Sequence, residues 1–327
     1  MPTQPTTLSK SRELASETTP PLLAASIADY DAWIATTQKS LSLLHRSHPA
    51  RINHVQILAV ARLARYTLSH QREDLDKSVL HYAKAILLLP IHAKPSLNVV
   101  RAFRDLASAL LIRSKEFEQP DGIKYAIEYL SYIRRFPLDS SNVPRTPLAI
   151  PLTRALWLQV TSDAGNWTQD INEMVVLCNE LLSSNKSEDV PIAPFIYLEA
   201  AASHVEFHGF PTEMLDEIIE CLRNAVKVCA RAPASYEVTF ALARRLTARF
   251  MRAHSKEDYE EATVVLERIL KPGGCPDSFR VIPSSLTTLL AYCYETSIFI
   301  SFLDYWQVTL ICDMDLLRFI HVTLTYL

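Results

Sequence analysis

Glycine is scarce in this chain, with only five in 327 residues. Sheet proteins, dinucleotide-binding folds and phosphate-binding loops use glycine where φ is positive or where the backbone approaches a ligand. The sequence also has no phosphate loop, no dinucleotide fingerprint and no serine nucleophile elbow. These shortages argue against an α/β enzyme and are typical of helices joined by short polar turns.

An excess of positive charge and long apolar runs are also missing. The formal net charge is −3, and no basic stripe stands out along the chain, so we expect no nucleic-acid partner. No uncharged apolar run reaches the ~18–20 residues that a membrane-spanning helix needs. The N-terminus has no apolar signal-peptide core. Together these features predict a cytoplasmic protein that does not enter a membrane.

Motifs for disulfides, metals and nucleophiles are weak. No two of the six cysteines form a CxxC pair, and most lie in apolar helical stretches, as expected of buried thiols in a reducing compartment. His204 and His208 have an i, i+4 spacing that can bind zinc, but no third ligand is evident. The turn Gly273-Gly274-Cys275 is expected to cap a helix. We therefore predict that the chain has no catalytic, cofactor-binding or metal-binding residue and that it is not an enzyme.

Helical periodicity dominates what is present. Hydrophobic residues make up 49% of the chain, which is ample for a core, and from Leu23 onward they recur at helical spacing. One pattern, apolar or small at i, i+3, i+4, i+7 and i+10, returns five times, with starts 48, 48, 44 and 44 residues apart. The copies begin at Leu75, Ile123, Ile171, Leu215 and Tyr259, and a weaker sixth begins at Tyr30.

A second helical stretch precedes each of the five copies, so the repeating unit is a pair of helices. The expected first helices cover residues 52–69, 95–115, 147–162, 193–208 and 235–253. Short polar turns join the two helices of a pair, and prolines separate the pairs. One pair cannot bury its own apolar face, whereas stacked neighbours complete a common core.

The finest sign of repetition is shared by two segments, Ala64-Arg65-Tyr66 and Ala248-Arg249-Phe250, which lie at the same distance ahead of the next copy. At these residues the chain resembles tetratricopeptide-like (TPR-like) helical arrays, and it is most similar to the long-period arrays of mushroom-forming fungi. The resemblance covers about residues 50–272. It implies an all-α fold, a right-handed superhelix of five or six antiparallel helix pairs.

The expected organisation has three parts. Residues 1–22, rich in Thr, Ser and Pro, are expected to be a disordered tail, and residues 23–297 form the array. Residues 298–327 are apolar and represent either a C-terminal helix or the truncated end of the array. In the fungal proteins that the chain resembles, the array often precedes a caspase-like protease domain. No such domain follows here, so the resemblance implies the recognition part alone.

Five residues are candidates for binding a partner. Arg65, Arg113 and Arg249 recur at the ends of three first helices, and Asn98 and Arg101 lie three residues apart on the helix that also carries Arg113. They could grip an acidic peptide, as the carboxylate clamps of TPR proteins do. A simpler interpretation is that the arginines interact with helix dipoles and last carbonyls, and that Asn98 and Arg101 belong to a solvated face.

Three tyrosines offer a further candidate surface. Tyr125, Tyr129 and Tyr132 recur at i, i+4 and i+7 on one expected helix. They either line a groove for a peptide or pack between repeats, and burial of all three would favour packing.

The expected function is that of a protein-interaction scaffold or recognition arm, which binds a protein or peptide on the concave face of the array. The alternative is a regulatory or sensor module of a signalling assembly whose protease or nucleotide-switch part lies on another chain. No residue supports a third possibility, an all-α enzyme.

Overall fold

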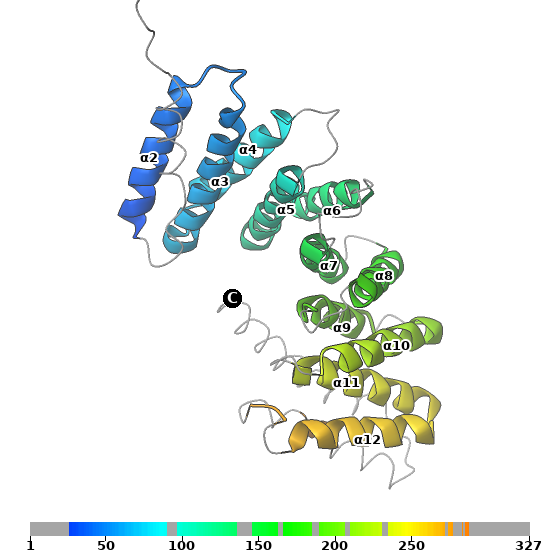
Figure 1. The fold of residues 1–327 in the computed structure, drawn as a ribbon. Helices are drawn as coiled ribbons and strands as arrows, with labels where there is room; N and C mark the ends of the chain where they lie inside the picture. The colour runs from blue at the N-terminus through cyan, green and yellow to red at the C-terminus, as the bar shows by residue number, and fades with distance from the viewer. Residues whose placement is uncertain are drawn as a thin grey trace, which may run out of the picture. The chain divides into compact units, whose positions relative to one another are not determined.

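The computed structural model describes residues 26–89, 97–135, 146–162, 166–184, 190–206, 210–230, 235–271, 274–276, 283 and 285–287. This part of the chain is helical and contains no β-strand (Figure 1). The expected tail at 1–22 and the apolar segment at 298–327 lie outside it. The helices are α2 (Ile27–Leu43), α3 (Ala50–Ser69), α4 (Arg72–Leu87), α5 (Leu97–Phe117), α6 (Asp121–Arg135), α7 (Thr146–Thr161), α8 (Trp167–Ser184), α9 (Ala193–Val205), α10 (Thr212–Val228), α11 (Ser235–Ala253) and α12 (Lys256–Leu270).

Helices are found where the sequence predicts them. The first helices of the five pairs are α3, α5, α7, α9 and α11, and the second helices are α4, α6, α8, α10 and α12. The weak sixth copy at Tyr30 falls within α2, which we count with the second helices. The largest boundary difference is at α9, which ends at Val205 and not at residue 208.

The chain divides into two compact units, Met1–Ala155 and Leu156–Leu327, which we call unit 1 and unit 2. In unit 1 each helix from α2 to α6 packs against the next one in sequence. In unit 2 neighbours also pack together, and in addition α8 packs against α10 and α9 against α11. Within unit 2, therefore, second helices contact second helices and first helices contact first helices.

The residues that carry the periodic pattern form the core. In α10 the predicted positions Leu215, Ile218, Ile219, Leu222 and Ala225 are all at most 1% exposed. Burying a large aliphatic side chain contributes roughly 1.5–3 kcal/mol, so one such stripe is enough to fix which face of the helix turns inward.

The turn between the two helices of a pair repeats in its backbone conformation. Among the described residues, the non-glycine residues with positive φ are His70 (52°), Glu118 (51°) and His254 (52°), each five residues before the first apolar position of its copy. A left-handed residue ends a helix and reverses the chain. The N–H groups of His70 and His254 donate to the carbonyls of Tyr66 and Phe250, both at 2.7 Å. The repeat thus makes the turn without glycine.

Gly122 in α6 is a position where a side chain does not fit. A Cβ atom there would lie 2.1 Å from Ser114 Oγ and 3.1 Å from the Leu110 carbonyl oxygen, both on α5. Alanine gains about 1 kcal/mol of helix propensity over glycine, but overpacking costs typically 1–3 kcal/mol. We expect Gly122→Ala to lower the free energy of unfolding, measured by urea denaturation.

A second substitution serves as the control. Ser114 Oγ is buried and has no hydrogen-bond partner among the described residues, so Ser114→Ala is expected to be neutral or slightly stabilising. The double variant Ser114→Ala/Gly122→Ala should recover most of the loss because the overlapping oxygen is gone. Equal stability of Gly122→Ala and the unsubstituted protein would show that α5 and α6 do not approach so closely.

Candidate functional site

Arg65, one of the predicted binding residues, connects three consecutive helices. Its guanidinium, at the end of α3, donates from Nη1 to both carboxylate oxygens of Asp74 on α4 at 2.9 Å. Its Nε lies 2.9 Å from Asp31 Oδ1 on α2. Arg62 also donates to Asp74, at 2.8 Å. The Asp74 side chain is 1% exposed, so this contact lies inside the helix packing.

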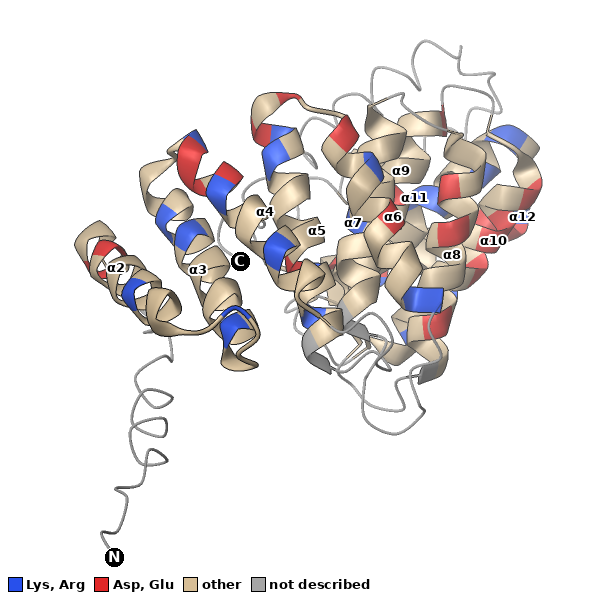
Figure 2. Cartoon of the chain, turned by 90° about the horizontal axis from the view of Figure 1, so that it is seen from above, with Lys and Arg blue, Asp and Glu red and all other residues tan. Residues whose placement is uncertain are grey.

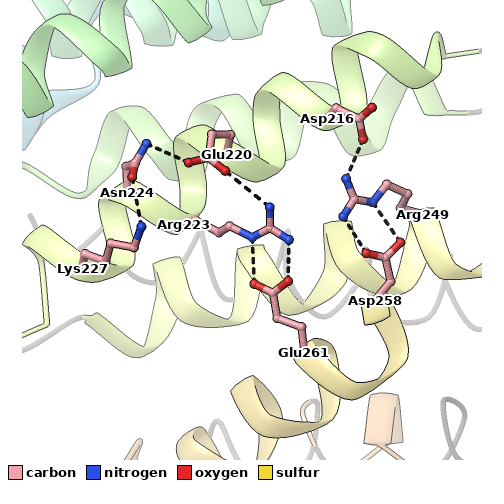
Figure 3. Close-up of polar contacts among 8 residues, drawn as sticks. All are labelled: Asp216, Glu220, Arg223, Asn224, Lys227, Arg249, Asp258 and Glu261. Carbon is pink, nitrogen blue, oxygen red and sulfur yellow. Dashed lines mark hydrogen bonds and ion pairs between the residues drawn. The ribbon is translucent and has the colours of Figure 1, made fainter. Parts of the chain in front are cut away.

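Arg249 makes the same connection in unit 2 (Figure 3). From α11 it donates to the two carboxylate oxygens of Asp258 on α12, at 2.9 and 2.5 Å, and to Asp216 on α10 at 2.6 Å. The hydrogen bond to Asp258 raises the pKa of Arg249 above its usual value, with a further contribution from Asp216. Arg223 on α10 forms a second link to α12 through both carboxylate oxygens of Glu261.

The two connections occupy equivalent positions of the repeat, and we call each an Arg–Asp bridge. The arginine precedes the aspartate of its own pair by nine residues in both cases. The aspartate on the preceding second helix lies 34 residues before Arg65 and 33 before Arg249. Both arginines are therefore held by carboxylates of the chain itself, a role that the sequence did not reveal.

The three helix pairs between α4 and α11 lack the complete Arg–Asp bridge. Arg113 on α5 lies 3.8 Å from Asp76 on α4, and the position nine residues after it is Gly122. In the pair α9–α10 the two positions are Val205 and Met214, which are both buried. A buried charge without its partner is costly, so both members of the pair are apolar there.

Asp170 on α8 keeps the carboxylate, but the position nine residues before it is Thr161. Gln159 instead donates to the two oxygens of Asp170, at 3.1 and 2.9 Å. Burial raises the pKa of Asp170, and the charge of Glu173 adds to this, while the hydrogen bond from Gln159 lowers it. An acid whose pKa is raised on folding stabilises the fold at low pH and loses this contribution as pH rises through the folded pKa.

We therefore expect Asp170→Asn to raise the melting temperature at pH 7, because asparagine removes the charge. The difference from the unsubstituted protein should disappear towards pH 3, where the aspartate is protonated. The matched control is Asp74→Asn, which removes a carboxylate that two arginines contact and should lower the melting temperature at pH 7. A lower melting temperature for Asp170→Asn at pH 7 would contradict this account.

The other two predicted binding residues lie on α5. The side chain of Asn98 is outside the described residues. Arg101 is exposed, and Arg104 pairs with its neighbour Asp105 at 2.6 Å. Lys115 is also exposed. It lies 14 residues after Arg101, a spacing that places it on the same side of the helix as Arg101 and Arg104. We call the set Arg101, Arg104 and Lys115 the α5 basic face.

The three tyrosines of α6 are not buried together. Tyr125 and Tyr132 are 47% and 52% exposed, and Tyr129 is half-buried. The rings of Tyr129 and Tyr132 both lie 5.9 Å from that of Phe103 on α5. Burial of all three, which would favour packing between repeats, is not observed.

The weaker motifs of the sequence give no reactive site in the described part of the chain. His204 lies on α9 and His208 outside the described residues, and no group of three His, Cys, Asp or Glu residues that could hold a metal is found within them. Burial raises the pKa of the Cys178 thiol well above its usual value, assisted by Cys221. Cys275 is also buried and forms no disulfide with another described cysteine. No described helix has the length and apolar character that crossing a membrane requires.

A buried charge cluster joins α9 to α11 and was missed by sequence reasoning. Glu199 on α9 lies 3.4 Å from Arg244 and 3.2 Å from Arg245 on α11, and Arg245 lies 3.1 Å from Glu206. All four side chains are at most 6% exposed. The available signal was the pair Arg244-Arg245 within the largely apolar stretch 238–246 of α11.

No protein-family model matches the chain, and no curated protein is significantly similar to it. The TPR-like resemblance therefore rests on the repeat itself.

Proposed function

We propose that the chain is a TPR-like helical-repeat protein that serves as a scaffold or recognition arm for another protein. The recurrence of the Arg–Asp bridge in the pairs α3–α4 and α11–α12 carries this proposal. It is supported by the shared left-handed turns and by the packing of α8 on α10 and α9 on α11. In stacked helix pairs the first helices line one concave surface, which offers an extended binding site.

The α5 basic face is the part of that surface that we assign to binding. Arg65 and Arg249 are held by aspartates and belong to the architecture. Arg101 and Lys115 are exposed, so a partner can reach them without breaking an ion pair to any described residue. Exposed charges at an interface mainly set partner choice and association rate.

The proposal is tested by affinity purification from a native lysate with quantitative mass spectrometry. The tagged chain is compared with Arg101→Glu/Lys115→Glu and with a control, Lys124→Glu, which reverses an exposed charge on the second helix α6. We expect a protein that the chain and the control retain and that the double variant loses by about tenfold or more, equivalent to ~1.4 kcal/mol. Equal recovery by all three would contradict binding at the α5 basic face.

The same purification separates a passive scaffold from a regulatory module. If the retained protein is a protease or a nucleotide hydrolase, its activity is measured with and without the chain. A change that the double variant fails to produce indicates regulation.

A further inference from the structure

Charge divides between the two classes of helix. The five first helices together carry 12 Lys and Arg against 4 Asp and Glu, a net charge of +8. The second helices, with α2, carry 11 against 19, a net charge of −8. The positive charge of the first helices and the negative charge of the second helices cancel, and the overall net charge is only −3. The net charge of the whole sequence therefore reveals neither excess.

The two excesses also fall in different units. In unit 1 the second helices α2, α4 and α6 are neutral together, whereas α3 has three arginines and no acid. In unit 2 the second helices α8, α10 and α12 carry 4 basic against 12 acidic residues. Figure 2 shows basic residues on α3 and α5, and acidic residues gathered on α10 and α12. Residues 1–155 have a net charge of +7 and residues 156–327 of −10.

Both surfaces present exposed side chains. On the α5 basic face these are Arg101 and Lys115. On α10, Glu213, Glu217 and Glu220 are exposed and lie at i, i+4 and i+7, which aligns them along the helix. We call these three the α10 acidic face. Arg223 and Arg249 lie beside it (Figure 3). Arg223 donates to Glu220 at 3.4 Å and to both carboxylate oxygens of Glu261 on α12, and Arg249 donates to Asp258 on α12.

We propose that a second copy of this chain is a partner, with the α5 basic face of one copy bound to the α10 acidic face of another. Surfaces of opposite sign attract over several ångströms and speed encounter. The low overall charge leaves little general repulsion between copies. Because the contact joins two different surfaces, each complex keeps one free face of each sign, and association continues into larger assemblies or a closed ring.

Sedimentation velocity of the full chain tests this at two salt concentrations. Screening shortens from ~30 Å at 0.01 M salt to ~8 Å at 0.15 M. We expect the mass to rise with protein concentration at low salt, and the association constant to fall by about tenfold or more at the higher salt. A monomer under every condition would overturn the proposal.

Two variants locate the surfaces. Arg101→Glu/Lys115→Glu reverses the basic face and Glu217→Lys/Glu220→Lys the acidic face, and each alone should be monomeric at low salt. Mixed together they should associate again, because the two intact faces are complementary to each other and so are the two reversed faces. A chain with all four substitutions should associate again. Lys124→Glu is the control and should associate like the unsubstituted chain.

Two outcomes of the variant experiments would overturn the assignment of the surfaces. A mixture that stays monomeric while the unsubstituted chain associates would show that other surfaces are used. Loss of association in the Lys124→Glu control would show a general charge effect and would also overturn the assignment. Failure here leaves the proposed function testable, since affinity purification detects proteins other than this chain.

Discussion

Replacing Glu199 with alanine is expected to lower the free energy of unfolding of unit 2 by about 3–5 kcal/mol, the typical effect of breaking a buried ion pair. Glu199 is 3% exposed, and it contacts Arg244 and Arg245, which are 6% and 2% exposed. Ser203 donates a hydrogen bond to it at 3.1 Å. The large effect arises because two arginines would remain inside the protein with less compensating negative charge.

Urea denaturation measures the loss, and hydrogen exchange localises it. Peptides from α9 and α11 should exchange faster in Glu199→Ala, whereas peptides from α3 in unit 1 should not change. Glu199→Gln keeps the volume and removes the charge, so it should also destabilise. The control Glu217→Ala, at an exposed position of α10, should have no measurable effect. Unchanged stability of both Glu199 variants would contradict the described ion pairs.

Replacing Asp74 with alanine is expected to have the next largest effect, a loss of about 3 kcal/mol in unit 1. The Asp74 carboxylate is 1% exposed and accepts hydrogen bonds from Arg62 and Arg65, which are 12% and 19% exposed. The partial exposure of the arginines places the expected loss at the lower end of the range for buried pairs. The exposed neighbour Glu73 is the control, and Glu73→Ala should cost at most about 0.5 kcal/mol because it removes only an exposed ion pair with Lys77.

A double-mutant cycle tests whether the Arg–Asp bridge acts as a unit. Arg65→Ala and Asp74→Ala should be less destabilising together than the sum of the single variants, with a coupling of about 1–3 kcal/mol. Arg249→Ala and Asp258→Ala should give coupling of the same sign in unit 2, because the geometry is the same. Additive effects in both cycles would show that the bridges do not join the helices energetically.

The helices of the described part were predictable from the sequence because burial imposes its period on apolar residues. The first helix predicted at 235–253 is the observed α11, Ser235–Ala253. Boundaries were less certain where the turn residue is unusual. His70 and His254 adopt a left-handed conformation that glycine usually provides, and the sequence marked them only by their recurrence.

The roles of charged residues were much harder to predict. Arg65 at a helix end suggests an interaction with the helix dipole, whereas its contacts are Asp31 and Asp74 on two other helices. Recognising this requires knowing that α2 and α4 both pack against α3. The one available signal was the nine-residue Arg–Asp spacing, which recurs at Arg249 and Asp258. The charge difference between helix classes likewise appears only after the helices have been assigned.

The stacked array is the claim on which the proposed function depends, and small-angle X-ray scattering tests it most directly. Measured in high salt to suppress association, a compact globule of 327 residues would have a radius of gyration of about 20 Å. A stack of five or six helix pairs predicts a larger radius of gyration than this and a distance distribution with a long tail. A version that begins at residue 23 removes the contribution of the expected tail. A value near 20 Å with a symmetric distribution would contradict the account.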